Sequence, residues 1–421
     1  MATDTELLQL ASQDLSASQI LPELRSRFDS EALERGAVVR ELGYFLWAIE
    51  SATEPHLYID DEPAPALTRL SNSNVWVHAA ELLQGRSHAH YFRINGDVHG
   101  SRVDTSALTP DHYPQDGVPE GQLSEHMVHH SPVYRGWPIS WWVYASPGVD
   151  PAIPSPAMIW LDGNNFLSRD RRDRLFVVTE NLVAQRKIPP MIHILTAPGE
   201  LDPATMQMSR EKRRLRSLLY DSVNDDFNKM IFGEIMPQVQ PMFKVRTDGY
   251  SIGSCGQSSG GIGAFNMAWQ RPEAVSRVFS RIGTYTSIQW RWGQTDHNDR
   301  FGFDDPAGFL DGGNIFPFAI RKRPRKNIRV YLSDGSYDLE NTHGSWPLQN
   351  IQMANSLKMA EYDFRFVFGN SQHNITQGAA ECPEALAWIW RDYDQDRTEQ
   401  VYEMDAAEKE KPYFRVAIVN R

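Results

Sequence analysis

The sequence is poor in cysteine and has no long apolar run. Only two cysteines, Cys255 and Cys382, occur among the 421 residues, too few for a disulfide framework or a four-cysteine zinc site. No stretch reaches the roughly 18 apolar residues of a membrane-spanning helix. Residues 1–10 lack the basic segment that opens a secretory signal. We therefore expect no membrane association, and the low cysteine content favours a cytoplasmic location.

Positive charge is also in deficit. Lys and Arg number 42 against 54 Asp and Glu, so the net charge is −12, and we expect no nucleic-acid partner. Hydrophobic residues make up 41% and charged residues 23% of the chain, which is typical of a globular protein. The length allows two domains. Nothing in the sequence indicates an oligomeric state.

The pattern of residues changes along the chain. Residues 1–40 are interpreted as a helical segment. Over 41–125, short aromatic and β-branched stretches between Pro, Asn and Gly turns predict a small β-sandwich, with a linker expected over 104–121. Over 126–398, strands and helices alternate, which predicts a mostly parallel sheet with helices on both faces. Residues 399–421 form a charged tail.

The expected elements of the second region are short and well separated. The predicted strands are 140–144, 157–161, 191–195, 328–332 and 364–368, with a further one over 250–255. The predicted helices are 174–185, 224–236, 261–269, 349–359 and 383–390.

Residues 256–260, Gly-Gln-Ser-Ser-Gly, match the G-x-S-x-G pattern of a nucleophile elbow. A nucleophile on a sharp turn between strand and helix needs small neighbours two positions away, and the following helix directs its N-terminus at the reacting centre. The predicted strand before and helix after this motif supply that context. Ser258 is the candidate nucleophile, and we expect Cys255 to be a small buried residue rather than a reactive thiol.

The acid of a catalytic triad follows the nucleophile along the chain in this kind of fold. Residues 333–338 form the loop expected after the strand 328–332 and contain two candidates, Asp334 and Asp338. Asp334 precedes glycine, and an Asp in a turn commonly bonds its own backbone. We therefore favour Asp338 and keep Asp334 as the alternative.

The histidine should follow the last strand of the sheet. His373 is the only histidine after the strand 364–368, so we expect it to be the general base. His343, in the extension of the acid loop, is the rival and could line the pocket instead.

The oxyanion hole needs two backbone N–H groups. One should come from Ser259, directly after the nucleophile. The other should come from Gly163 or Asn164, in the loop after the strand 157–161, where glycine allows the backbone to approach a substrate closely. This chemistry requires neither a metal nor a cofactor.

These stretches, with others along the chain, resemble the enterochelin (siderophore) esterase branch of the esterase D/feruloyl esterase-type α/β-hydrolases. The matching stretches are 160–164 (WLDGN), 184–191 (AQRKIPPM), 234–237 (EIMP), 256–261 (GQSSGG), 334–339 (DGSYDL), 344–348 (GSWPL), 362–369 (YDFRFVFG) and 388–393 (WIWRDY). The resemblance implies an α/β-hydrolase fold, an immunoglobulin-like N-terminal domain over 41–125, and a triad of Ser258, Asp338 and His373. It also implies a serine esterase acting on a small-molecule ester.

One segment departs from the family pattern and bears on the substrate. Residues 290–311 form a long stretch rich in Trp, His and Asp, and long irregular loops tend to be functional. We expect Trp290, Arg291 and Trp292, together with His343, to contact a bulky or polar ester. Alternative functions are a feruloyl or carbohydrate-ester esterase, an acyltransferase of the same fold, or a catalytically silent glycan-binding protein.

Overall fold

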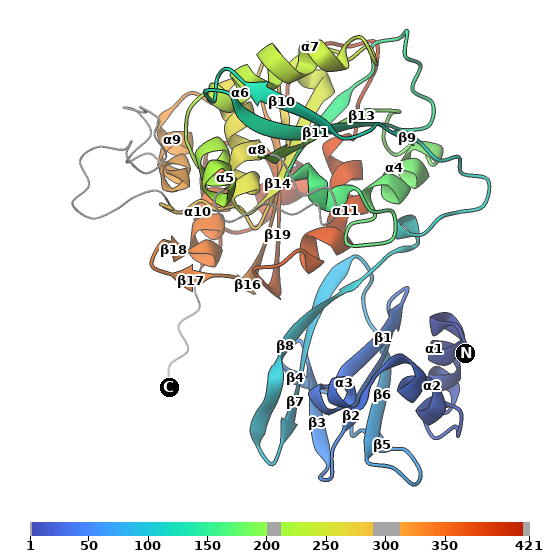
Figure 1. Cartoon of the computed structure of the whole chain (residues 1–421). Helices are drawn as coiled ribbons and strands as arrows, with labels where there is room; N and C mark the ends of the chain where they lie inside the picture. The colour runs from blue at the N-terminus through green and yellow to red at the C-terminus, as the bar shows by residue number, and fades with distance from the viewer. Residues whose placement is uncertain (1, 200–211, 289–311, 416–421) are drawn as a thin grey trace.

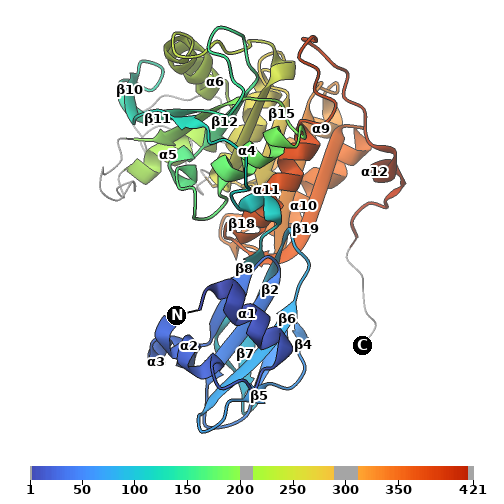
Figure 2. The same ribbon diagram turned by 90° about the vertical axis from the view of Figure 1, so that its right-hand side faces the viewer.

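A computed structural model describes residues 2–199, 212–288 and 312–415. A β-rich N-terminal region lies below a larger α/β region, and the two meet near the ends of β7 and β8 (Figures 1 and 2). The chain begins with three short helices: α1 (Asp4–Gln13), α2 (Ile20–Arg27) and α3 (Ser30–Arg35).

Two four-stranded antiparallel sheets follow these helices. The first has the order β1 (Ala37–Glu41), β2 (Tyr44–Glu50), β6 (Val75–Glu81), β5 (Thr68–Arg69). The second has the order β4 (Glu62–Pro63), β3 (Pro55–Ile59), β7 (Arg86–Ile94), β8 (Asp97–Ala107). Because β8 continues to Ala107, the expectation that the linker starts at Asp104 was wrong: the turn-forming composition begins only after this strand.

Strand β2 explains how the N-terminal layers hold together. Successive side chains of a strand point to opposite faces. Phe45 and Trp47 pack toward the second sheet, in one buried cluster with Leu57 and Phe92. The alternate residues of β2, such as Leu46, pack in another cluster with residues of the three helices. The first sheet is therefore buried on both faces.

The α/β region is built on a nine-stranded sheet. Its order is β10 (Met127–Ser131), β11 (Trp137–Ala145), β13 (Ile192–Pro198), β12 (Ala157–Leu161), β14 (Ile252–Gln257), β15 (Arg277–Arg281), β16 (Arg329–Tyr337), β19 (Asp363–Gln372), and β9 (Gln122–Leu123) pairs with β11. The strands from β13 to β19 run parallel, whereas β9, β10 and β11 are antiparallel to their neighbours. A small hairpin joins β17 (Glu340–Asn341) and β18 (Gly344–Ser345).

Helices cover both faces of this sheet. One face carries α4 (Leu175–Ala184) and α11 (Thr376–Ile389). The other carries α5 (Lys212–Tyr220), α6 (Asp226–Met230), a π-helical turn (Ile231–Ile235), α7 (Met236–Val239), α8 (Ser259–Gln270), α9 (Phe316–Lys322) and α10 (Trp346–Met359). Single 3-10 turns cover Pro110–His112, Gly163–Phe166, Gly249–Ser251 and Gly313–Ile315, and α12 (Ala406–Glu410) lies near the C-terminus.

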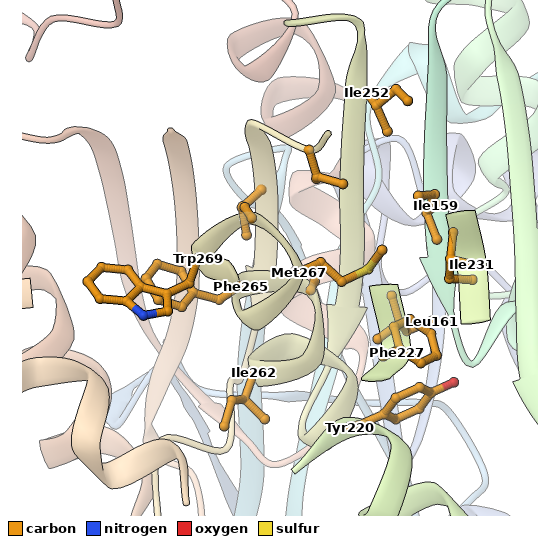
Figure 3. Packing of buried hydrophobic residues seen from close by; sticks show 14 of the residues in the cluster. Ile159, Leu161, Tyr220, Phe227, Ile231, Ile252, Ile262, Phe265, Met267 and Trp269 are labelled. Carbon is orange, nitrogen blue, oxygen red and sulfur yellow. The ribbon is translucent and has the colours of Figure 1, made fainter. Parts of the chain in front are cut away.

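The central strand β12 shows why the chain forms this layered core. All five of its side chains are buried, as expected for a parallel strand covered on both faces. Ile159 and Leu161 face the α5–α8 side and pack near Tyr220, Phe227 and Ile231 (Figure 3). Met158 and Trp160 belong to the cluster on the α4 and α11 side.

One predicted turn is strand. We expected Asp334 and Gly335 to form a turn, but β16 continues through them, pairing Asp334 with Phe368 and Gly335 with Gly369 of β19. A Cβ atom at Gly335 would lie 2.2 Å from the Ser371 carbonyl oxygen. Glycine is therefore required here by a close contact between strands and not by a local turn.

Among the helices of the described residues, none is long and apolar enough to cross a membrane.

Candidate active site

Ser258 stands at a sharp turn between β14 and α8, with φ 56° and ψ −124°. Positive φ is strained for a residue other than glycine, and such strain is a feature of nucleophile elbows. Gly256 allows the turn, since a Cβ atom there would lie 2.2 Å from the Gly260 carbonyl oxygen. The Ser258 N–H donates to the Arg281 carbonyl at 2.9 Å, which fixes the turn against β15. The serine therefore sits at the N-terminal end of α8.

Three side chains meet at the carboxyl edge of the sheet. Ser258 Oγ lies 2.9 Å from His373 Nε2, and His373 Nδ1 lies 2.5 Å from Asp338 Oδ1. They follow the ends of β14, β16 and β19, and ligands bind at this edge in open α/β sheets. The Asp338 side chain is 0% exposed and the His373 side chain is 20% exposed. The buried carboxylate thus faces away from solvent while the imidazole edge stays accessible.

Asp338 and Asp334 are neighbouring acids with different surroundings. Asp338 Oδ1 also accepts from the Leu339 N–H at 2.5 Å, so a backbone donor and the imidazole share one oxygen. Asp334 is fully buried. Burial, followed by its hydrogen bond to Asp338 and the charge of Asp338, raises the pKa of Asp334 well above its usual range. The raised pKa favours the protonated form of Asp334. Asp338, and not Asp334, is the carboxyl group that contacts the histidine.

The expected oxyanion-hole residues lie beside the elbow. Ser259, the first residue of α8, is buried, and its hydroxyl donates to Asp221 Oδ2 at 3.0 Å. Burial raises the pKa of Asp221 to about 6. Gly163 starts the 3-10 turn after β12, and a Cβ atom there would lie 2.5 Å from Leu195 Cβ. Asn164 follows it and is partly buried.

Arg216 on α5 bonds both to the loop after β12 and to the residue before Ser258. Its guanidinium donates to both carboxylate oxygens of Asp162, at 2.6 to 2.9 Å, and to the Gln257 carbonyl at 3.1 Å. Asp162 precedes Gly163 and has φ 56°, and Gln257 precedes Ser258. One side chain therefore ties the loop after β12 to the nucleophile elbow.

The model of the Esterase family, described as "Putative esterase", matches residues 135–377, more than half of the chain. The chain belongs to this family. It is thus a carboxylic ester hydrolase.

The esterase also has the fold of solved enzymes. An enterobactin esterase from Shigella flexneri, determined with enterobactin, superposes with a TM-score of 0.53 at 13% identity, covering 90% of this chain and 99% of that one. Ferric enterobactin esterase from Salmonella typhimurium gives a TM-score of 0.51 at 14% identity, covering 88% and 98%. These similarities show an α/β-hydrolase-type fold. Comparison with curated protein sequences gives no match.

The residues expected to bind substrate are only partly within the described chain. His343 lies at the turn between β17 and β18, partly exposed, and its carbonyl accepts from the Ser287 N–H at 3.4 Å. Trp290, Arg291 and Trp292, with the rest of 290–311, lie outside the described residues. Cys255 is fully buried, and burial raises the pKa of its thiol.

Two further side chains lie beside the serine and the histidine, and the sequence assigned neither of them a role. Thr284 Oγ1 lies 3.3 Å from Ser258 Oγ and accepts from Trp346 Nε1 at 3.2 Å. The Trp346 ring stands edge-on to the His373 imidazole, with centroids 5.7 Å apart. Thr284 lies in a loop without a motif, whereas Trp346 belongs to a stretch that carries the family resemblance. Thr284 thus contacts the serine, and Trp346, the first residue of α10, contacts both Thr284 and the histidine ring.

The described part of the chain has no group of three or more His, Cys, Asp or Glu side chains arranged to hold a metal ion.

Proposed function

We propose that this esterase cleaves a bulky or polar carboxylic ester through a Ser258–His373–Asp338 triad and an acyl-enzyme. The observation that carries the proposal is the continuous path of contacts from a strained elbow serine to a buried carboxylate, at 2.9 Å and 2.5 Å. Side chains from three separate strands meet in the order that acyl transfer requires.

The proposed reaction has two halves. In the first, Ser258 Oγ attacks the ester carbonyl while its proton passes to His373 Nε2. The tetrahedral intermediate collapses, and the imidazolium returns this proton to the leaving alkoxide. In the second half, a water molecule attacks the acyl-serine with His373 again as base, which releases the carboxylic acid and restores Ser258. Asp338 keeps the proton on Nδ1 and stabilises the imidazolium.

The developing oxyanion requires two preorganised N–H donors. We assign them to Ser259 and to Gly163 or Asn164. The location of Ser259 at the start of α8 adds the positive end of the helix dipole. The tie that Arg216 makes between the Asp162 loop and the Gln257 carbonyl supports a fixed distance between the two donors.

A bulky substrate is consistent with the surface beside the triad acid. Tyr337 and Leu339, on either side of Asp338, are 50% and 38% exposed, and aromatic side chains readily stack on ring-bearing groups. The structurally similar enzymes described above are enterobactin esterases by name. We therefore assign a large ester, with the siderophore class first among the candidates.

We also propose a two-domain division, with an immunoglobulin-like sandwich before residue 126 and a catalytic domain over 126–398. Two antiparallel sheets that share an apolar layer support the sandwich. The nine-stranded sheet, with its own core on each face, supports a separate catalytic domain.

The test is a hydrolysis screen of wild type and Ser258→Ala over aryl, feruloyl, acetyl-sugar and catecholate-siderophore esters. Wild type should cleave at least one class, and Ser258→Ala should lose roughly 10⁴- to 10⁶-fold in kcat, as triad losses do. Ser254→Ala is a control, because this buried hydroxyl lies in the same strand and donates to the Ala264 carbonyl.

Ser254→Ala should retain activity within about threefold, since its hydroxyl takes no part in the triad. A folded wild type that cleaves none of the four classes would refute the proposal. Retention of more than about a tenth of the activity by Ser258→Ala would remove this serine from the role.

A further inference from the structure

The loop that carries His373 is held from outside the catalytic sheet. Asn370, Gln372, Asn374 and Thr376 all contact the N-terminal sheet β3–β7–β8, which both views place beside β19 and α11 (Figures 1 and 2). Gln372 ends β19, residues 373–375 form a bend, and Thr376 begins α11. In this arrangement the His373 imidazole contacts Ser258 while the residues on either side of it bond to the N-terminal region.

Asp104 of β8 makes the central contact. Its Oδ2 accepts from the Gln372 N–H at 2.6 Å and from Asn374 Nδ2 at 2.7 Å. These donors belong to the residues directly before and directly after His373. The Asp104 side chain is 0% exposed, and hydrogen bonds to a carboxylate are shorter and stronger than neutral ones. One buried carboxylate oxygen therefore holds the backbone of the residue before the histidine and the side chain of the residue after it.

Other bonds extend this attachment along the loop. They are Gln372 Nε2 to the Arg102 carbonyl (3.0 Å), Arg102 Nη2 to the Asn370 carbonyl (3.2 Å), Asn370 Nδ2 to Asp60 Oδ1 (2.9 Å), Ser106 Oγ to the Thr376 carbonyl (2.7 Å), and a bond between the Ser87 and Thr376 hydroxyls (2.9 Å). Arg102 also reaches toward the acid loop, with its guanidinium carbon 3.8 Å from the centre of the Tyr337 ring. The N-terminal sheet thus contacts residues beside both His373 and Asp338.

We propose that the N-terminal sheet is part of the catalytic apparatus, and that Asp104 is a positioning residue for His373. The inference rests on the proposed triad. A histidine base must be held within about 0.5 Å of its productive position, and a misplacement of about 1 Å can cost on the order of 100-fold in rate. The two bonds of Asp104 hold the residues directly before and after the imidazole, in addition to the contacts that His373 itself makes with Ser258 and Asp338.

The test compares Asp104→Ala with Asp104→Asn. Alanine leaves the Gln372 N–H and the Asn374 amide without their acceptor, so kcat should fall about 10- to 100-fold. KM should change less than about threefold, because substrate binding is not the step affected. In Asp104→Asn the amide oxygen can accept both bonds, so kcat should recover to within about fivefold of wild type.

Arg86→Gln is the matched control. Arg86 of β7 also joins the two regions, through a 2.9 Å ion pair with Glu384 of α11. Within the part of the chain that the structure describes, its side chain bonds to Glu384 and the Gly85 carbonyl and not to residues 370–376. Its loss should leave kcat within about twofold, as expected for a partly exposed pair. A general loosening of the interface would instead lower kcat in both Arg86→Gln and Asp104→Ala.

A second variant covers the case in which Asp104→Ala does not fold. Asn374→Ala keeps Asp104 and the Gln372 bond and removes only one donor, so kcat should fall about 3- to 10-fold with KM unchanged. Folded variants at both positions with wild-type kcat would overturn the positioning role. An inactive wild type, or an active Ser258→Ala, would instead overturn the triad, so the two failures are distinguishable.

Discussion

The two neighbouring carboxyl groups, Asp338 and Asp334, provide a sharp prediction because the same substitution should act very differently on each. Asp338→Asn replaces the carboxyl group that lies 2.5 Å from His373 Nδ1 and whose side chain is 0% exposed. The asparagine amide can donate to Nδ1 and so favour the wrong tautomer. We expect kcat to fall about 10⁴-fold, equivalent to about 5 kcal/mol of transition-state stabilisation.

Asp334→Asn should be far milder. Burial, and then its hydrogen bond to Asp338 and the charge of Asp338, raise the pKa of Asp334 well above the usual range, which favours its protonated form. Asparagine is therefore a near match for the neutral acid, and its amide can still donate to Asp338. We expect kcat to fall less than about tenfold.

The raised pKa of Asp334 also makes the free energy of unfolding depend on pH. The folded state retains the Asp334 proton above the pH at which the unfolded chain releases it, so wild-type stability falls as pH rises from about 4 toward the raised pKa. Asp334→Asn removes this loss and should be relatively more stable at pH 8 than at pH 5.

The assay is steady-state hydrolysis of an activated aryl ester at pH 7.5, with urea unfolding of each variant at pH 5 and pH 8. Exposed Glu399→Gln controls for the loss of one carboxyl. A larger loss of kcat in Asp334→Asn than in Asp338→Asn, with both variants folded, would refute this reasoning and make Asp334 the triad acid.

Three further predictions concern the elbow and the core. Arg216→Lys loses the paired contacts to Asp162, so steady-state kinetics should show kcat lowered at least about tenfold while KM changes little. An unchanged kcat would show that Arg216 does not position the loop after β12 for catalysis. Gly256→Ala places a Cβ atom 2.2 Å from the Gly260 carbonyl oxygen, so soluble yield and activity should both collapse, and an active, stable variant would contradict the elbow geometry. Burial raises the pKa of Glu381 from 4.5 to about 8, so wild type should lose up to about 1.4 kcal/mol of unfolding free energy per pH unit over that range. In urea unfolding, Glu381→Gln should lack this loss of unfolding free energy with rising pH. If wild type and Glu381→Gln lost the same free energy per pH unit, Glu381 would be ionised in the folded state and the prediction would be wrong.

Much of the catalytic region could be predicted because its signals are local or depend only on element order. The spacing of two glycines around Ser258 indicates a turn that no bulkier residues would allow. The sequence favours Asp338 and His373 because each follows a predicted parallel strand, and the carboxyl ends of such strands meet at one edge of the sheet. The structure brings all three side chains into contact.

The features that escaped prediction depend on contacts between distant segments. Gly335 was interpreted as a turn residue, but its role is to admit Ser371 of the neighbouring strand. Asp104 was assigned to a linker from composition, although it lies in β8 and bonds to residues about 270 positions away. Arg216 and Thr284 have no motif around them, so only the folded chain places them beside the elbow. The sequence pattern therefore predicts local backbone geometry well, but it does not identify which distant residues come into contact.

The most direct test of the account is to react the protein with a fluorophosphonate and locate the adduct by peptide mass spectrometry. An activated serine at an elbow, paired with a histidine base, should form a stable phosphonyl ester. We predict one adduct per chain, on Ser258, with ester hydrolysis lost in proportion to labelling. Inactivation with the adduct on another residue, or full hydrolytic activity with Ser258 labelled, would contradict the account.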